Sequence, residues 1–139
     1  MQRIFLVFVV MMISFTTVMA QTNNKLAAAS AARGKMVYLQ RCMVCHQADG
    51  GGVPKLNAPL DGSTAVNGTN IAKLVKYIVK GLNDRIEIDG EFYENAMPAA
   101  DDLKDQQIAD VLTFIRSNWS NKAGPVTLTQ VKQIRSKLK

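Results

Sequence analysis

Apolar residues recur at helical spacing in two stretches of the chain, and each stretch predicts a helix with one buried face. The first covers residues 70–80 and ends before Gly81, a residue suited to a C-terminal cap. The second covers residues 105–117. Thr127 and Gln130 have the spacing of a capping box, so we expect a short C-terminal helix after them. The apolar positions are Ile71, Leu74, Val75, Ile78 and Val79 in the first stretch, and Ile108, Val111, Leu112 and Ile115 in the second.

The remaining segments predict one more helix, one loop and one hairpin. A helix is expected from about Leu26 or Ala31 through Arg41. Residues 47–69 are rich in Gly, Pro, Asn and Asp, which predicts a long loop with little regular structure. In residues 86–93, "IEIDGEFY", apolar and polar positions alternate about an Asp-Gly pair, which is a hairpin signal. The predicted fold class is therefore all-α, mostly helical, with one small β-hairpin.

Residues 1–20 have the pattern of a cleaved secretory signal peptide. Residues 4–13 form an unbroken apolar run after a basic residue, and "VMA" places small residues before a cut predicted after Ala20. An uncleaved anchor is disfavoured because ten apolar residues fall short of the roughly 20 that span a bilayer. We therefore expect a periplasmic or otherwise exported protein without stable membrane insertion. Its mature chain would be a single domain, residues 21–139, in which residues 120–139 form a C-terminal extension carrying the short helix.

Charge is unevenly distributed along the chain. Without the basic residue of the signal peptide, 16 basic and 11 acidic residues remain, a net charge of +5. Residues 84–110 hold nine acidic residues and two basic ones, whereas residues 111–139 hold six basic residues and no acidic one. Such asymmetry can steer a docking partner, although incidental clustering on a solvated surface gives the same pattern. Nucleic-acid binding is not expected, because no basic stripe with interleaved aromatic residues is present.

Both cysteines and the only histidine fall within "CMVCH": Cys42, Cys45 and His46. A structural zinc site needs about four nitrogen or sulfur ligands, and no second Cys/His cluster completes the set. A disulfide would close too small a loop to stabilise much. A thioredoxin-like pair would need a βαβ pattern, and a nucleophilic Cys–His pair usually comes together from distant parts of a chain.

Cys-X-X-Cys-His is the sequence of covalent c-type haem attachment. Residues three positions apart lie on one face of a helical turn, so Cys42 and Cys45 can form thioethers to two vinyl groups of one porphyrin. His46 can then supply an axial nitrogen to the iron. The motif predicts one covalently bound haem c.

Met97 is the predicted second axial ligand of the iron. The chain has no second histidine, and four of its seven methionines lie in the signal peptide. Met36 and Met43 lie too close to the attachment motif to reach the opposite face of the haem. Met97, in "NAMPAAD", is the methionine that follows His46, and His/Met ligation is an established haem arrangement. Ligation by lysine, an open site, and a merely packed core methionine are the alternatives.

Taken together, these motifs resemble a class I c-type cytochrome over nearly the whole mature chain. "GKMVYLQRCMVCHQADGGGVP" is similar to the N-terminal helix, haem motif and glycine-rich loop of that family. "MP" followed by "LKDQQIADVLTFIRSNW" resembles its methionine loop and C-terminal helix. The resemblance implies the class I cytochrome c fold wrapped around one haem. It also implies that the two helices cross closely, with Gly34 or Tyr38 near Phe114.

The resemblance also implies a partner for the histidine ring, at a place where the chain departs from the family. The family usually has a proline two residues before a leucine, and the carbonyl of that proline accepts the histidine Nδ1–H. In "NAPLDG" the matching position is Ala58, with Pro59 one residue late. Either carbonyl could therefore serve.

With both axial positions filled, the expected function is that of a periplasmic mono-haem electron-transfer protein rather than an enzyme. It would carry one electron, as a free carrier or as a subunit of a dehydrogenase or oxidase chain, between redox partner proteins that the sequence does not identify. The alternative is a haem enzyme or a gas-binding sensor in which Met97 is a labile ligand.

Overall fold

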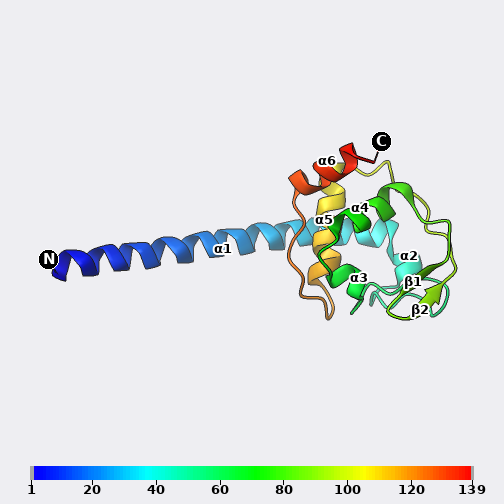
Figure 1. The fold of residues 1–139 in the computed structure, drawn as a ribbon, viewed down its shortest axis with the longest axis horizontal. Coiled ribbons are helices and arrows are strands. Elements are labelled where there is room, and N and C mark those ends of the chain that lie inside the picture. The colour runs from blue at the N-terminus through cyan, green and yellow to red at the C-terminus, as the bar shows by residue number, and fades with distance from the viewer. Residues whose placement is uncertain (1, 139) are drawn as a thin grey trace.

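The computed structural model describes the backbone of residues 2–138 and the side chains of residues 21 and 23–138. The predicted signal peptide therefore lies outside the residues whose side chains are described. The fold is mostly helical with one two-stranded sheet, which confirms the predicted class (Figure 1). The elements are α1 (Gln2–Arg41), α2 (Met43–His46), α3 (Thr64–Asn67), α4 (Ile71–Lys80), β1 (Ile86–Ile88), β2 (Glu91–Tyr93), α5 (Asp105–Ser117) and α6 (Leu128–Ser136).

Helix α1 starts much earlier than the sequence predicts. The predicted start at Leu26 or Ala31 is wrong, because the helix runs without a break from Gln2 and extends away from the other elements in Figure 1. The physical reason is that no proline or glycine precedes Gly34, so nothing interrupts the helical hydrogen bonds. Within the part of the chain whose side chains are described, no helix is long and apolar enough to cross a membrane.

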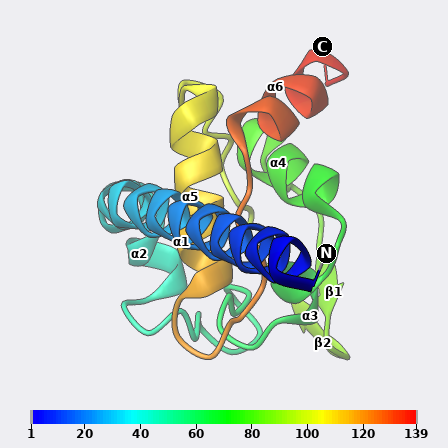
Figure 2. The same ribbon diagram turned by 90° about the vertical axis from the view of Figure 1, so that its left-hand side faces the viewer.

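Helices α1 and α5 cross at a glycine, and the crossing forms one side of the core (Figure 2). A Cβ atom on Gly34 would lie 1.9 Å from the carbonyl oxygen of Asp110, so only glycine lets the helices approach this closely. One turn later, the ring centroids of Tyr38 and Phe114 lie 5.4 Å apart. Both contacts implied by the family resemblance are confirmed.

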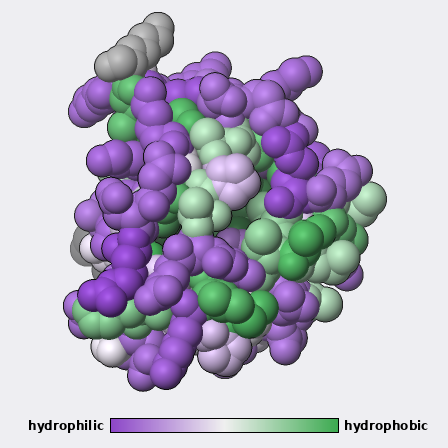
Figure 3. All heavy atoms as spheres, turned by 90° about the vertical axis from the view of Figure 1, so that its right-hand side faces the viewer, coloured by the Kyte–Doolittle hydropathy of each residue, from purple (hydrophilic) through white to green (hydrophobic). Residues whose placement is uncertain are grey.

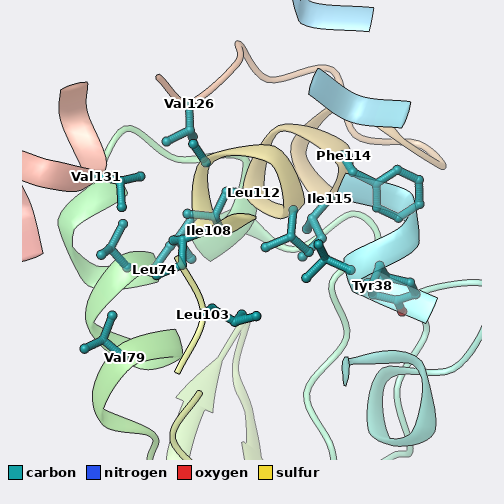
Figure 4. Close-up of a cluster of buried hydrophobic side chains, with 14 of the residues drawn as sticks. Tyr38, Leu74, Val79, Leu103, Ile108, Leu112, Phe114, Ile115, Val126 and Val131 are labelled. Atoms are coloured by element: carbon teal, nitrogen blue, oxygen red, sulfur yellow. The ribbon is translucent and has the colours of Figure 1, made fainter. Parts of the chain in front are cut away.

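Helices α4 and α6 pack against α5 and complete the core. Figure 4 shows Val126 and Val131 directed into the same apolar cluster as Leu74 and Leu112. The predicted caps are confirmed, because Gly81 is the C-cap of α4 and the capping box of Thr127 and Gln130 precedes α6.

The predicted hairpin is confirmed, and the predicted loop before α4 needs one correction. Strands β1 and β2 pair in an antiparallel register with Ile86 opposite Tyr93. The turn residues Asp89 and Gly90 both have positive φ, +55° and +84°, as a tight two-residue hairpin turn requires. The long loop over residues 47–69 also contains α3, a single helical turn that the glycine-rich composition did not predict.

Candidate functional site

Helix α2, a single turn directly after α1, presents Cys42, Cys45 and His46 together. The amide N–H of Cys42 donates to the carbonyl of Tyr38, 2.9 Å away, and the N–H of His46 donates to the carbonyl of Cys42, 3.0 Å away. The helical path therefore continues almost without interruption through the motif. Both cysteines carry free thiols. Burial raises the pKa of the Cys42 thiol to about 11, so that thiol is protonated at neutral pH.

These three residues line a cavity of about 940 Å³, counted with its open mouth. Residues 95–100, which include Met97, line the same cavity. Figure 3 faces the side of the molecule that carries α2 and the hairpin, and apolar side chains gather across the middle of that face between hydrophilic ones. The apolar lining includes Ile78, Leu82, Ile86, Leu103 and Val111.

The imidazole of His46 is held by one backbone carbonyl. Its Nδ1 lies 2.9 Å from the carbonyl oxygen of Ala58. Of the two carbonyls that the sequence left open, Ala58 and Pro59, the structure places that of Ala58 against the ring. Burial lowers the pKa of His46, which favours the neutral ring, while the bond to Ala58 opposes that shift. A neutral ring that donates through Nδ1 keeps its Nε2 lone pair for another partner.

Two glycines shape the loop that brings this carbonyl to the histidine. Gly52 has φ +66°, and a Cβ atom there would lie 2.3 Å from the carbonyl oxygen of Asn57 and 2.8 Å from that of Ala58. Gly50 has φ +72° and packs directly against the ring of Trp119. Glycine is therefore required at both positions, since a side chain would push the loop away from its partners.

Aromatic residues fix the chain just after His46. The hydroxyl of Tyr38 donates to the carbonyl of Gln47, 2.5 Å away, and Nε1 of Trp119 donates to the carbonyl of Ala48, 3.2 Å away. The rings of Tyr38 and Trp119 also contact one another, with centroids 5.4 Å apart. Sequence analysis missed this role of Trp119. The residue stood in the motif "RSNW", but no pattern connected it to the histidine segment.

Met97 lines the same cavity as His46, on a segment held by backbone hydrogen bonds. Met97 and Leu82 form an isolated antiparallel bridge, with both N–H···O distances at 2.8 Å. The N–H of Ala100 donates to the carbonyl of Ile78, also at 2.8 Å. Gly81, with φ +70°, permits this approach, because a Cβ atom there would lie 2.4 Å from the carbonyl oxygen of Met97.

The parts of the cavity lining near His46 and near Met97 are also joined directly. The N–H of Glu94 donates to the carbonyl of Lys55 and that of Asn95 to the carbonyl of Leu56, each at 3.1 Å. The loop that follows the histidine and the segment that carries Met97 are therefore parts of one hydrogen-bonded frame. Sequence patterns did not indicate this pairing, because neither segment reads as a strand.

The residues of the cavity fit a covalently attached haem. They supply two free thiols on one turn, an imidazole whose Nδ1 is already engaged, the thioether of Met97, and an apolar lining. This donor set is that of a His/Met-ligated c-type haem. The geometry thus brings together Cys42, Cys45, His46 and Met97, the four residues that the sequence selected.

Comparisons with known proteins agree with this fit. The cytochrome c family model matches residues 31–119. The chain is 38% identical over 120 residues to the cytochrome c subunit of a quinone alcohol dehydrogenase from Gluconacetobacter polyoxogenes, covering 82% of this chain and 25% of that protein. It is 34% identical over 121 residues to cytochrome c-552 from Thermus thermophilus, covering 79% of each protein.

A third relative is the gluconate 2-dehydrogenase cytochrome c subunit from Pantoea cypripedii, 33% identical over 108 residues, with 73% of this chain and 24% of that protein covered. The chain thus spans about a quarter of the length of the dehydrogenase subunits that it matches.

Proposed function

This chain belongs to the cytochrome c family, and from that premise we propose that it is an exported one-electron carrier with His/Met axial ligation. As a member of the family it is an electron-transfer cytochrome that binds haem c covalently. The observation that carries the finer proposal is that His46 and Met97 line one apolar cavity, each held by a hydrogen bond to or from the backbone.

In this proposal Cys42 and Cys45 would hold the haem through thioether bonds, and His46 and Met97 would bind its iron. The iron supplies a one-electron change between its ferric and ferrous states. Ala58 fixes the plane of the imidazole through Nδ1 and raises its basicity as a ligand. The apolar lining excludes water, and the backbone hydrogen bonds at His46 and Met97 keep both side chains in place in either oxidation state. With no position left for a substrate, the chain is a carrier and has no catalytic activity of its own.

Export to the periplasm is proposed from the N-terminal sequence. The pattern of residues 1–20 predicts cleavage after Ala20, and covalent haem attachment takes place outside the cytoplasm. Mass spectrometry of the haem protein from a periplasmic extract should give a chain that begins at Gln21. A haem protein that retains residues 1–20 in the membrane fraction would contradict cleavage.

The same site suits a free carrier and a subunit of a dehydrogenase complex. The relatives that match the chain include a protein named cytochrome c-552 and proteins named as cytochrome c subunits of dehydrogenases. Purification from the native host at low salt separates the two. A free carrier elutes alone at the size of a monomer, whereas a subunit elutes together with a dehydrogenase.

The ligand assignment is tested by replacing Met97. In the ferric state the wild type should be low-spin, with the charge-transfer band of a sulfur–iron bond, and Met97→Ala should lose that band. Met36→Ala is the matched control, because Met36 is 56% exposed on α1 and far in sequence from the segment that carries Met97. We expect it to keep the wild-type spectrum.

The alternative function gives the opposite result. A gas-binding sensor or a haem enzyme would show a high-spin ferric spectrum in the wild type, and it would bind CO in the ferrous state without a prior loss of Met97. That outcome would refute the carrier. Protein without covalent haem, made in a strain competent for cytochrome c assembly, would refute haem attachment itself.

A further inference from the structure

The segment that carries Met97 has few apolar contacts to hold it in place. Between residues 94 and 102 most side chains are exposed, and Leu103 is the first deeply buried residue after Met97, at 5% exposure. Segments with little buried apolar surface open locally at low free-energy cost. The position of Met97 therefore depends on the hydrogen bonds along this segment, which include its own bridge to Leu82.

The N-terminal end of the segment is held by the bonds from Glu94 and Asn95 to the loop after His46, and its middle by the Met97–Leu82 bridge and by the bond from Ala100 to Ile78 of α4. The C-terminal end is held by Arg135 of α6. Its Nη1 donates to the carbonyl oxygen of Leu103 at 2.6 Å, and its Nη2 donates to the carbonyl oxygen of Asp101. Without this guanidinium, both carbonyls would lose a charged donor.

Arg135 is itself held in position. Its Nη1 also lies 3.0 Å from Oδ1 of Asp105 at the start of α5, and both side chains are 28% exposed. The helix beneath it is anchored by Val131, which is fully buried in the core cluster (Figure 4). The guanidinium is therefore presented by a packed helix rather than by a free tail.

A second arginine contacts the same segment, but it is a weaker brace. Arg41 forms a two-pronged ion pair with Asp102, at 2.7 and 2.8 Å. These side chains are 39% and 61% exposed, and an exposed ion pair contributes only about 0–1 kcal/mol. It also holds a side chain, whereas Arg135 binds the backbone that leads to Met97.

From these contacts we propose that Arg135 is a positioning residue for Met97, and that α6 serves as a brace that keeps the methionine sulfur on the iron. The inference rests on the proposed function, since it assumes that Met97 is an axial ligand. Helix α6 lies beyond residues 31–119, the part of the chain that matches the family model.

The test measures how often Met97 leaves the iron. Cyanide binds ferric iron only after the sulfur has left, so its limiting binding rate at 25 °C reports that event. Arg135→Gln removes the charged donor to two carbonyls and should raise the rate about tenfold, the equivalent of about 1.4 kcal/mol. The charge-transfer band should weaken in the same variant.

Two variants serve as controls. Lys132→Gln removes the same charge from the same helix and should leave the cyanide rate unchanged, because Lys132 makes no hydrogen bond among the described residues. Val66→Ala removes buried apolar surface in α3, away from the cavity, and lowers global stability. Even if Val66→Ala loses as much thermal stability as Arg135→Gln, its cyanide-binding rate should stay near that of the wild type. A merely structural role for Arg135 would predict equal acceleration in both variants.

Every outcome of this test either supports or overturns the proposal. A rate for Arg135→Gln within twofold of the wild type, or equal acceleration in Val66→Ala, overturns the brace while leaving Met97 as the ligand. A wild type without the charge-transfer band refutes the ligand, and the brace fails with it. If Arg135→Gln does not fold, Arg135→Lys replaces it, because a single ammonium cannot donate to both carbonyls in the same geometry. A cyanide-binding rate between those of the wild type and Met97→Ala would then support the brace.

Discussion

The close crossing of α1 and α5 gives the sharpest prediction for stability. In Gly34→Ala the added Cβ atom would lie 1.9 Å from the carbonyl oxygen of Asp110, 2.4 Å from its carbonyl carbon and 2.9 Å from Cβ of Phe114. Ordinary contacts of a Cβ atom begin near 3.4 Å, so the helices must separate by about 1.5 Å (3.4 − 1.9). The obstacle is helix backbone, which cannot rotate away as a flexible side chain could.

The cost follows from two opposing effects. Overpacking a well-packed core costs about 1–3 kcal/mol, and a clash with backbone belongs at the upper end of that range. Alanine is favoured over glycine inside a helix by about 1 kcal/mol. The net loss for Gly34→Ala is therefore about 2 kcal/mol, which for a domain of this size lowers the midpoint of thermal unfolding by roughly 8 °C.

The assay is unfolding of the haem-loaded protein in guanidinium chloride and by heat, followed by far-ultraviolet circular dichroism. Gly124→Ala is the matched control, because a Cβ atom at that position meets nothing within 4 Å. We expect the control to be as stable as the wild type or slightly more so. A Gly34→Ala protein within about 0.5 kcal/mol of the wild type would show that the helices do not depend on glycine for their approach.

Two further predictions concern the histidine carbonyl and the acid range. Gly52→Ala should displace the carbonyl of Ala58 from His46, since its Cβ atom would lie 2.8 Å from that oxygen. The imidazole then becomes less basic, which should raise the midpoint potential by up to about 40 mV, the equivalent of one hydrogen bond of about 1 kcal/mol. An unchanged potential would count against this role for Ala58. Burial alone would raise the pKa of Asp110, but hydrogen bonds from Arg33 and other donors outweigh burial and lower it below the usual value. The carboxylate thus contributes stability that is complete above about pH 4 and is lost as the pH falls through the lowered pKa. Urea unfolding between pH 6 and pH 2.5 should therefore show a shallower acid loss in Asp110→Asn than in the wild type, and parallel curves would contradict the assignment.

The elements that the sequence predicted are those whose determinants are local. The helix over residues 71–80 has its own apolar stripe and a cap at each end, so its bounds could be predicted closely. The hairpin is determined by Asp89 and Gly90, two residues that accept positive φ. The start of α1 was predicted wrongly because the sequence there has no local signal: helix propensity indicates an end only where a helix-breaking residue is present.

The details of the site depend on approaches between segments, which a linear pattern does not contain. Whether Ala58 or Pro59 faces the histidine is decided by the turn at Gly52, where a positive φ lets the loop fold back on itself. The bonds from Arg135 to the carbonyls of Asp101 and Leu103 join residues more than thirty positions apart. No spacing rule connects such positions, because the link exists only once α6 has packed.

The charge pattern shows most clearly how folding changes a prediction made from counts. Arg116 belongs to the basic C-terminal stretch, yet it is 6% exposed and donates to the backbone carbonyls of Val66, Gly68 and Gly124.

On the acidic side, three of the nine carboxylates of residues 84–110 are paired with arginine: Asp102, Asp105 and Asp110. Paired charges contribute little to the field that a distant partner meets. Steering by charge must therefore come from the carboxylates that remain exposed and outside ion pairs among the described residues, which include Glu87 and Glu91 of the hairpin and Glu94 beside the cavity. The charge counts along the sequence therefore overstate the asymmetry of charge that a partner would meet on the folded protein.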